Sequence, residues 1–235
     1  MSSSFIDALL HASTPVIMEM KRRNAHGENL LGGRSLSEIV DDYHAVGAPC
    51  LSVVTGRWFG GSDELLRDIA CLTTLPILKK DFITKESQII QAKALGASAV
   101  LLTAQILPRS LLQRLIETSL RHALTPFVEV VSEEEIDAVV HGEDCVVAIN
   151  NKDIRQGERG RGDVNRSLCL LPSTHRTETR CPVSASGIDN PEIAAQLVTA
   201  GFKGLLIATS LLRAQSLETW VRNFEQHRHA LGGAQ

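Results

Sequence analysis

The chain has 235 residues, of which 43% are hydrophobic and 22% are charged, and its formal net charge is −3. This much apolar material suffices for one large domain or two small ones. The near balance of charges excludes a global electrostatic attraction to nucleic acid or to an anionic membrane. No apolar run approaches the ~20 residues that span a bilayer. We therefore expect neither a nucleic-acid nor a membrane partner, and any anionic ligand must be bound by a local site.

The cysteines and the N-terminal residues bear on the location of the protein, and the histidines bear on metal binding. Its five cysteines form no C-x-x-C pair and are odd in number, which is typical of reduced thiols. The eight histidines form no H-x-x-x-H motif and no His/Cys cluster, so we expect no metal. The first fourteen residues lack a basic start and carry Asp7 inside their apolar stretch, which makes a poor signal peptide. We predict a cytoplasmic protein.

Short aliphatic or β-branched runs alternate with longer amphipathic segments along the chain, which indicates repeated βα units. The predicted strands are, in chain order, Val16–Met20, Leu51–Val54, Pro76–Lys79, Ala99–Thr103, Pro126–Val130, Val146–Ile149, Pro182–Ser184 and Gly204–Ile207. The segments between them carry the signals of helix starts and ends. These signals are the capping-box pairs Ser35 with Glu38 and Ser132 with Glu135, the Asn190-Pro191 start, and the terminal glycines Gly47, Gly96 and Gly201.

Eight βα units without a composition break predict a single (β/α)₈ TIM barrel of ordinary size. One domain would cover 1–235, with a short N-terminal extension over 1–14 and a flexible tail over 225–235. A doubly wound open sheet is the rival, disfavoured because no G-x-G-x-x-G follows the first strand. Two polar, glycine-containing segments, Arg22–Arg34 and Arg155–Ser167, are expected to be mobile loops at the C-terminal face, where the active sites of such barrels lie.

Ionisable residues occur within the predicted strands, although the side chains of strands in a parallel barrel are buried and should be apolar. Glu19 and Lys21 alternate across Met20, so both lie on one face near the end of the first strand. Lys79 and Lys80 point to opposite faces, and the pattern does not settle which of them enters the barrel. Further polar residues near strand ends are Glu129, Asn150, Asn151, Lys152, Ser184 and Ser186.

Any one of these residues could simply form a salt bridge at the barrel rim. Together, however, they all lie at the same end of one predicted barrel, and this clustering favours a catalytic site. A buried lysine beside a carboxylate can act as a general acid and base pair. Small residues at Ser186-Gly187 and at Ala208-Thr209-Ser210 are expected to open helices after the last two strands. They suggest the usual phosphate site of this fold, with ordinary helix capping as the alternative.

At these residues the sequence resembles indole-3-glycerol phosphate synthases, from about Pro15 to Phe224. The resemblance rests on Glu19-Met20-Lys21, Ser52-Val53-Val54-Thr55 with Phe59-Gly60-Gly61-Ser62, Leu78-Lys79-Lys80-Asp81-Phe82-Ile83, Val128-Glu129-Val130, Ile149-Asn150-Asn151-Lys152-Asp153-Ile154 and Ser184-Ala185-Ser186-Gly187-Ile188. It implies closure of the indole ring of 1-(2-carboxyphenylamino)-1-deoxyribulose 5-phosphate, with loss of carbon dioxide and water, in tryptophan biosynthesis. The partner would be this small phosphorylated substrate, with no metal or organic cofactor.

The resemblance also implies roles for individual residues. Lys80, rather than Lys79, would be the general acid and Glu129 its carboxylate counterpart. The remaining catalytic residues would be Glu19, Lys21, Asn150 and Ser186. Substrate would be held by Phe59, Phe82, Leu101, Lys152 and Ile154, with its phosphate on Lys21, Gly187, Ala208 and Thr209.

The sequence departs from the family pattern at several positions. Lys152 stands where arginine is usual, Ala185 where glutamate is usual and Ala208 where glycine is usual. The family usually shows Ser-Pro-Ser soon after the lysine of the first strand, whereas here Arg22-Arg23-Asn24-Ala25 follows Lys21. The N-terminal extension is also shorter than in the family. These departures keep open a paralogue that acts on a related aryl-amino sugar phosphate. Another phosphate-binding barrel enzyme, an isomerase or aldolase, and a non-catalytic metabolite-binding barrel are further alternatives. The protein is expected to be a monomer or a small homo-oligomer.

Overall fold

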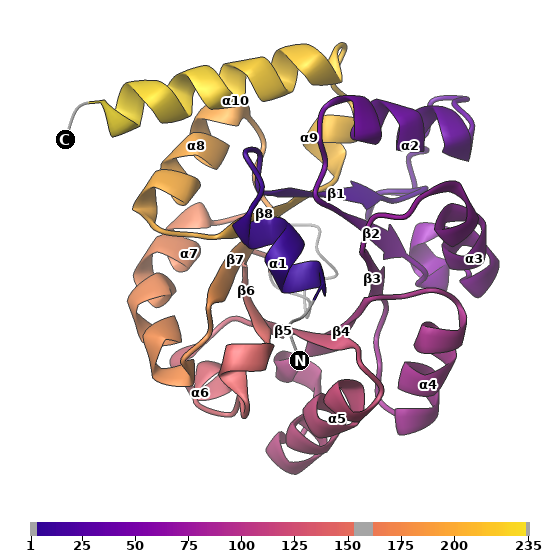
Figure 1. The fold of residues 1–235 in the computed structure, drawn as a ribbon, viewed down its shortest axis with the longest axis vertical. Coiled ribbons are helices and arrows are strands. Elements are labelled where there is room, and N and C mark those ends of the chain that lie inside the picture. Colours follow the sequence, from indigo (N-terminus) through magenta and orange to yellow (C-terminus); the bar gives the residue numbers. More distant parts are fainter. Residues whose placement is uncertain (1–3, 153–161, 234–235) are drawn as a thin grey trace.

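The computed structural model describes residues 4–152 and 162–233. Eight parallel strands close into a barrel in the order of the chain, with helices around the outside (Figure 1), so the predicted (β/α)₈ barrel is confirmed. All eight predicted strands are present, with ends that differ by at most one residue. The strands are β1 Val16–Met20, β2 Cys50–Val54, β3 Ile77–Lys80, β4 Ala99–Thr103, β5 Thr125–Val130, β6 Val146–Asn150, β7 Cys181–Ala185 and β8 Gly204–Ile207.

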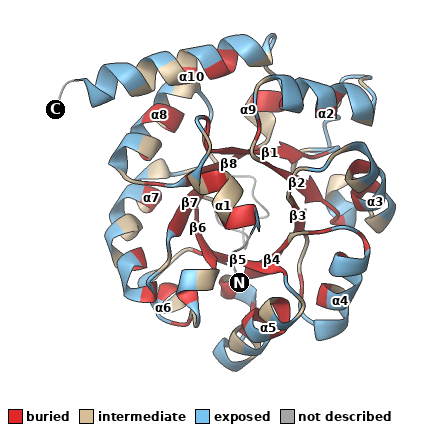
Figure 2. Cartoon of the chain, in the orientation of Figure 1, coloured by how far each residue is buried: buried red, intermediate tan, exposed pale blue. Residues whose placement is uncertain are grey.

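The helices pack against the strands with their inner faces and expose their outer faces (Figure 2). They are α1 Ser4–Leu10, α2 Leu36–Ala45, α3 Asp63–Leu72, α4 Glu86–Ala94, α5 Arg109–Arg121, α6 Glu133–Ile136, α7 Val164–Leu170, α8 Pro191–Ala200, α9 Thr209–Leu212 and α10 Leu217–Gly232. Within the described part of the chain, no helix is long and apolar enough to cross a membrane.

Most of the predicted helix signals have the expected geometry. Ser35 and Glu38 form a complete capping box at the start of α2, and the Asn190 side chain caps α8 with proline as the first helical residue. Ser132 caps α6, but the Glu135 carboxylate accepts from the Val131 amide instead of closing the box. The three terminal glycines all have positive φ: Gly47, Gly96 and Gly201.

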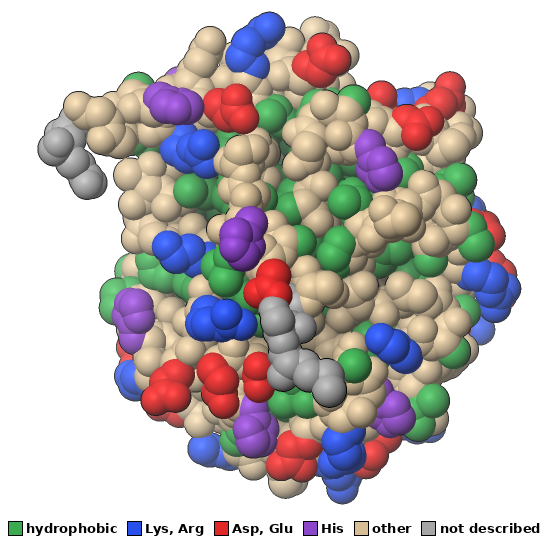
Figure 3. All heavy atoms as spheres, viewed as in Figure 1, with side chains coloured by type: hydrophobic (Ala, Val, Ile, Leu, Met, Phe, Trp, Pro, Cys, Tyr) green, Lys and Arg blue, Asp and Glu red, His purple; other side chains and the backbone are tan. Residues whose placement is uncertain are grey.

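The barrel lumen is apolar at its N-terminal end. Alternate strand residues point inward, and the inward set packs with Phe5, Ile6 and Leu9 of α1, a helix that lies across the end of the barrel (Figure 1). The rings of Phe5 and Phe127 meet edge to face with centroids 6.3 Å apart. On this face acidic, basic and histidine side chains are interspersed (Figure 3). Since this end is filled by apolar side chains, ligand chemistry is confined to the C-terminal end.

Residues 225–232, expected as part of a flexible tail, are helical in the structure, and the flexibility of this end stays a prediction. They belong to α10, which packs on α8 and whose Trp220 and Phe224 side chains are buried, with their rings stacked on each other. This helix is also tied to the N-terminal segment, because Thr14 Oγ1 donates to Glu225 Oε1 over 3.1 Å. Helix α10 therefore continues beyond Phe224 as far as Gly232.

The two expected loops have different outcomes. The segment Arg22–Arg34 follows β1, and an isolated antiparallel β-bridge joins Arg23 to Asn29 within it. The mobility of this segment stays a prediction. Of the segment Arg155–Ser167, residues 155–161 lie outside the described residues. Residues 164–167 are not a loop but the first turn of α7, because the Asp163 side chain caps this helix and Ser167 is fully buried.

Candidate active site

Lys80 enters the barrel and Lys79 does not. On β3, Leu78 belongs to the apolar lumen cluster whereas Ile77 packs outside, so Lys80 continues the inward row. Its Nζ lies 3.7 Å from Oε2 of Glu19 on β1. Lys79 instead forms an ion pair with Asp63 of α3, outside the barrel. The structure thus resolves the alternative that the strand pattern left open.

Glu19 is held in place by groups on neighbouring elements. Its carboxylate is buried, and Oε2 accepts a hydrogen bond of 3.0 Å from Ser52 Oγ on β2. The Tyr43 hydroxyl of α2 donates to the backbone oxygen of Glu19 over 3.1 Å. Burial, with a smaller contribution from Glu19, raises the pKa of Tyr43 far above its usual value, so the phenol stays a neutral donor. Glu19 is therefore an oriented carboxylate facing a lysine.

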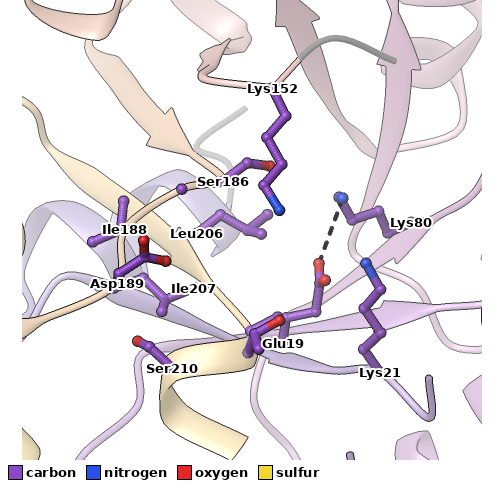
Figure 4. Close-up of a pocket in the computed structure, with 13 residues that line it drawn as sticks. Glu19, Lys21, Lys80, Lys152, Ser186, Ile188, Asp189, Leu206, Ile207 and Ser210 are labelled. Atoms are coloured by element: carbon purple, nitrogen blue, oxygen red, sulfur yellow. Dashed lines mark ion pairs between the residues drawn. The ribbon is translucent and has the colours of Figure 1, made fainter. Parts of the chain in front are cut away.

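A charged cavity opens beside this ion pair at the C-terminal ends of β1, β7 and β8 (Figure 4). Figure 4 shows the ammonium groups of Lys21, Lys80 and Lys152 directed toward the space above Glu19. Eight residues expected at the site line this cavity: Glu19, Lys21, Lys80, Lys152, Ser186, Gly187, Ala208 and Thr209. Ser210, named with Ala208 and Thr209 in the expected phosphate site, also lines it. The remaining lining residues had no expected role in the site, and they are Ile188, Asp189, Leu206 and Ile207.

A second, more apolar cavity lies on the other side of Lys80. The expected residues Phe59, Phe82, Leu101 and Glu129 line it together with Lys80. Sequence reasoning missed Val54, Gly56, Trp58 and Asp81, which complete its wall. Lys80 therefore contributes to both cavities.

Two aromatic contacts shape the apolar cavity. The indole of Trp58 is tilted by 31° against the Phe82 ring at a centroid distance of 5.3 Å, and 59% of this residue is exposed. A Cβ on Gly56 would lie 3.3 Å from the Trp58 indole, so glycine leaves room for that ring. Lys21 Nζ lies 3.8 Å above the centre of the Phe59 ring, a cation–π contact that connects the apolar wall with the charged cavity.

Asn150 ends β6 and is fully buried, but it lines neither cavity. Its Oδ1 accepts from the Lys152 amide over 2.9 Å. Asn150 Nδ2, like Ser210 Oγ in the charged cavity, is a buried polar atom without a hydrogen-bond partner among the described residues. Such groups are costly unless a ligand or water satisfies them. Ile154, another expected contact, lies outside the described residues.

The turn after β7 corrects one expectation. Gly187 does not open a helix, because α8 begins only at Pro191. Ser186 and Gly187 instead form a turn in which both residues have a φ of 68°. Thr209 does open the short helix α9, as expected.

The described residues contain no group of three or more His, Cys, Asp or Glu side chains that could hold a metal ion. The polar side chains that line the charged cavity are three lysines, two carboxylates and three hydroxyls. Lysine-rich donor sets of this kind suit an anionic organic ligand.

The fold and this site define a (β/α)₈-barrel enzyme that places a lysine and carboxylate cluster at the C-terminal end of its strands. The family model of indole-3-glycerol phosphate synthase matches residues 1–224, and the chain belongs to this family. It is similar to the indole-3-glycerol phosphate synthase of Bacteroides thetaiotaomicron, with 34% identity over 224 residues, which are 95% of this chain and 84% of the relative. The enzyme of Pyrococcus furiosus is 33% identical over 211 residues, 89% of this chain and 91% of the relative.

Proposed function

We propose that the protein closes the indole ring of 1-(2-carboxyphenylamino)-1-deoxyribulose 5-phosphate, with release of carbon dioxide and water. The observation that carries this proposal is the position of Lys80 between a charged cavity and an apolar aromatic cavity. The substrate has the same order of parts, because its ketone lies between a phosphorylated chain and an aryl ring. Phosphate in the charged cavity and aryl ring in the apolar one bring the ketone to Lys80.

The residues divide the chemistry among them. The Lys80 ammonium polarises and protonates the ketone oxygen while a ring carbon attacks the carbonyl carbon. Glu19, 3.7 Å from Lys80 Nζ, holds the ammonium in place. Loss of carbon dioxide follows, and Glu129, which lines the aryl side, assists proton removal as the hydroxyl leaves as water. No step requires a redox change.

The binding roles follow from the two linings. Phe59, Phe82 and Leu101 pack against the aryl ring. On the other side, Lys21 and Lys152 supply charge to the phosphate, and Gly187, Ala208 and Thr209 form the wall beside it. Ser186 contributes from the turn, and the catalytic role of Asn150, whose buried Nδ2 lacks a hydrogen-bond partner among the described residues but lies in neither lining, stays a prediction.

The departures from the family pattern concern the charged cavity and its surroundings. Ala185 is fully buried and packs in the apolar lumen cluster, so the usual carboxylate is absent from the end of β7. We therefore extend the proposal to related aryl-amino sugar phosphates, for which Ala185→Glu is the diagnostic variant. A change in the ranking of kcat/KM across ring-substituted substrates in this variant would assign selection to position 185.

The test of the proposed function is direct. The purified protein is mixed with the anthranilate-substituted deoxyribulose phosphate, and indole absorbance and fluorescence are followed together with released carbon dioxide. Equimolar indole-3-glycerol phosphate and carbon dioxide are expected, and a protein that forms neither would refute the proposal. A cytoplasmic location and a monomeric or small homo-oligomeric state remain predictions, to be tested by cell fractionation and by light scattering.

A further inference from the structure

Asn151 lies immediately outside the lumen and reaches the turn that follows β7. Its side chain is 2% exposed, and its backbone amide donates to Ala185 O over 2.9 Å. The Nδ2 group donates to Ser184 Oγ over 3.0 Å and to the backbone oxygen of Ser186 over 2.9 Å. Since a backbone oxygen only accepts, the orientation of this amide is determined by its surroundings.

Ser167 of α7 completes the arrangement around Asn151. Its Oγ donates to Asn151 Oδ1 over 2.8 Å and lies 2.7 Å from Ser184 Oγ. Both serines are fully buried. The Asn151 amide therefore uses both its oxygen and its nitrogen in hydrogen bonds within one buried network. We call this network of Asn151, Ser167 and Ser184 the β6–β7 brace.

The brace holds a turn that is strained. Ser186 has a φ of 68°, a left-handed conformation that is unfavourable for a residue with a side chain. Such a conformation persists only where the surroundings determine it, and the bond from Asn151 acts on the Ser186 carbonyl itself. Gly187 is packed so closely that a Cβ on it would come within 2.6 Å of Gly162 Cα. The turn is thus fixed from two sides, and both of its residues line the charged cavity.

We propose that Asn151 is a positioning residue that, through the β6–β7 brace, holds the Ser186–Gly187 turn in the shape required to bind the phosphorylated end of the substrate. Asn151 does not touch the cavity and acts only through the turn. The inference rests on the proposed function, since that function supplies the phosphorylated ligand. Without the brace, Ser186 relaxes toward negative φ and the wall of the charged cavity moves.

The first experiment compares Asn151→Ala with Asn165→Ala, a matched control. Asn165 is an exposed residue of α7, so its loss removes the same amide from the surface. For folded Asn151→Ala we expect a loss of kcat/KM on the order of tenfold or more, mainly through KM. The inhibition constant of inorganic phosphate should rise in parallel. Wild-type values of both quantities in folded Asn151→Ala would overturn the inference.

A double-mutant cycle separates positioning from general stability. Ser186→Gly removes the strain at this position, because glycine adopts a φ of 68° without cost. In the Ser186→Gly background, Asn151→Ala should therefore lower kcat/KM by less than about threefold. An undiminished penalty in that background would refute a role that works through the turn.

Ser167→Ala covers the case in which Asn151→Ala fails to fold, because it removes the bond to Asn151 Oδ1 and leaves Asn151 present. We expect a several-fold rise of KM in this variant, and wild-type kinetics would contradict the brace. If the wild-type protein forms no indole, the proposed function fails by itself. Calorimetric titration of inorganic phosphate into wild type and Asn151→Ala would then still decide the positioning role, with equal affinities counting against it.

Discussion

Replacing Lys80 by methionine should abolish most of the activity while leaving the substrate pockets in shape. Methionine has a volume close to that of lysine and keeps the apolar part of the side chain, but it has no proton to donate. The removal of a positioned proton donor lowers kcat by about 10²–10⁴. This loss corresponds to about 3–5 kcal/mol in the activation free energy.

The variant also has a structural cost that follows from the geometry. Glu19 is 2% exposed and would lose the ammonium that lies 3.7 Å from its Oε2. A buried charge that loses its partner costs about 3–5 kcal/mol of stability. The Ser52 hydrogen bond of 3.0 Å remains and offsets part of this cost. Kinetics of Lys80→Met must therefore be measured at a temperature where circular dichroism shows the variant to be folded.

Lys79→Met is the matched control, with the same chemical change one residue away. The partner of Lys79, Asp63, has a side chain that is 31% exposed and also accepts a hydrogen bond of 2.7 Å from Gln91. Loss of this pair should cost about 1 kcal/mol or less of stability and leave kcat unchanged. The assay is single-turnover indole formation at saturating substrate. A folded Lys80→Met protein with wild-type turnover, or an inactive folded Lys79→Met protein, would refute the assignment.

Three further predictions concern other parts of the structure. Glu129→Gln should slow proton removal and dehydration more than ring closure, so that a partly processed intermediate accumulates in rapid-quench mass spectrometry; an unaltered time course would contradict its role. Trp58→Ala should raise KM several-fold with little effect on kcat, because the Trp58 indole forms an outer wall of the apolar cavity. An unchanged KM would show that the aryl ring of the substrate binds elsewhere. A thiol reagent should label only the two exposed cysteines of the native protein, because burial shields the other three and raises the pKa of the Cys181 thiol to about 12; labelling of more than two would contradict the packing of the hydrophobic core. The exposed cysteines are Cys71 and Cys169, and the buried ones are Cys50, Cys145 and Cys181.

The barrel could be predicted from the sequence because its signals are local and repeated. Each strand is a short apolar run between turn residues, and the helix ends carry glycines such as Gly47 and Gly96, whose positive φ only glycine adopts readily. The choice between Lys79 and Lys80 could not be made in this way. Both faces of a barrel strand are buried, so the apolar pattern has no polar side that would indicate the inward direction.

Other features of the site depend on contacts between distant segments. Ser186 and Gly187 are expected to open a helix because small residues are common at helix starts. Only the folded structure shows that Gly162, distant in the sequence, packs against Gly187. Trp58 was missed because a single aromatic residue in a loop belongs to no periodic pattern. Asn151 appears in the sequence as one of several polar residues after β6, and its function depends on a serine of α7 and a serine of β7.

The charged cavity explains how a chain of net negative charge can bind a phosphorylated substrate. The formal charge of the whole chain is −3, so no long-range attraction draws an anion to it. Among the described residues that line the cavity, however, three lysines face two carboxylates, Glu19 and Asp189. The local balance is therefore positive, and the walls around it are of low dielectric, where charge interactions are stronger than in water. Glu19 pairs with Lys80, and Lys21 and Lys152 extend toward the same space from the ends of β1 and β6 on different sides.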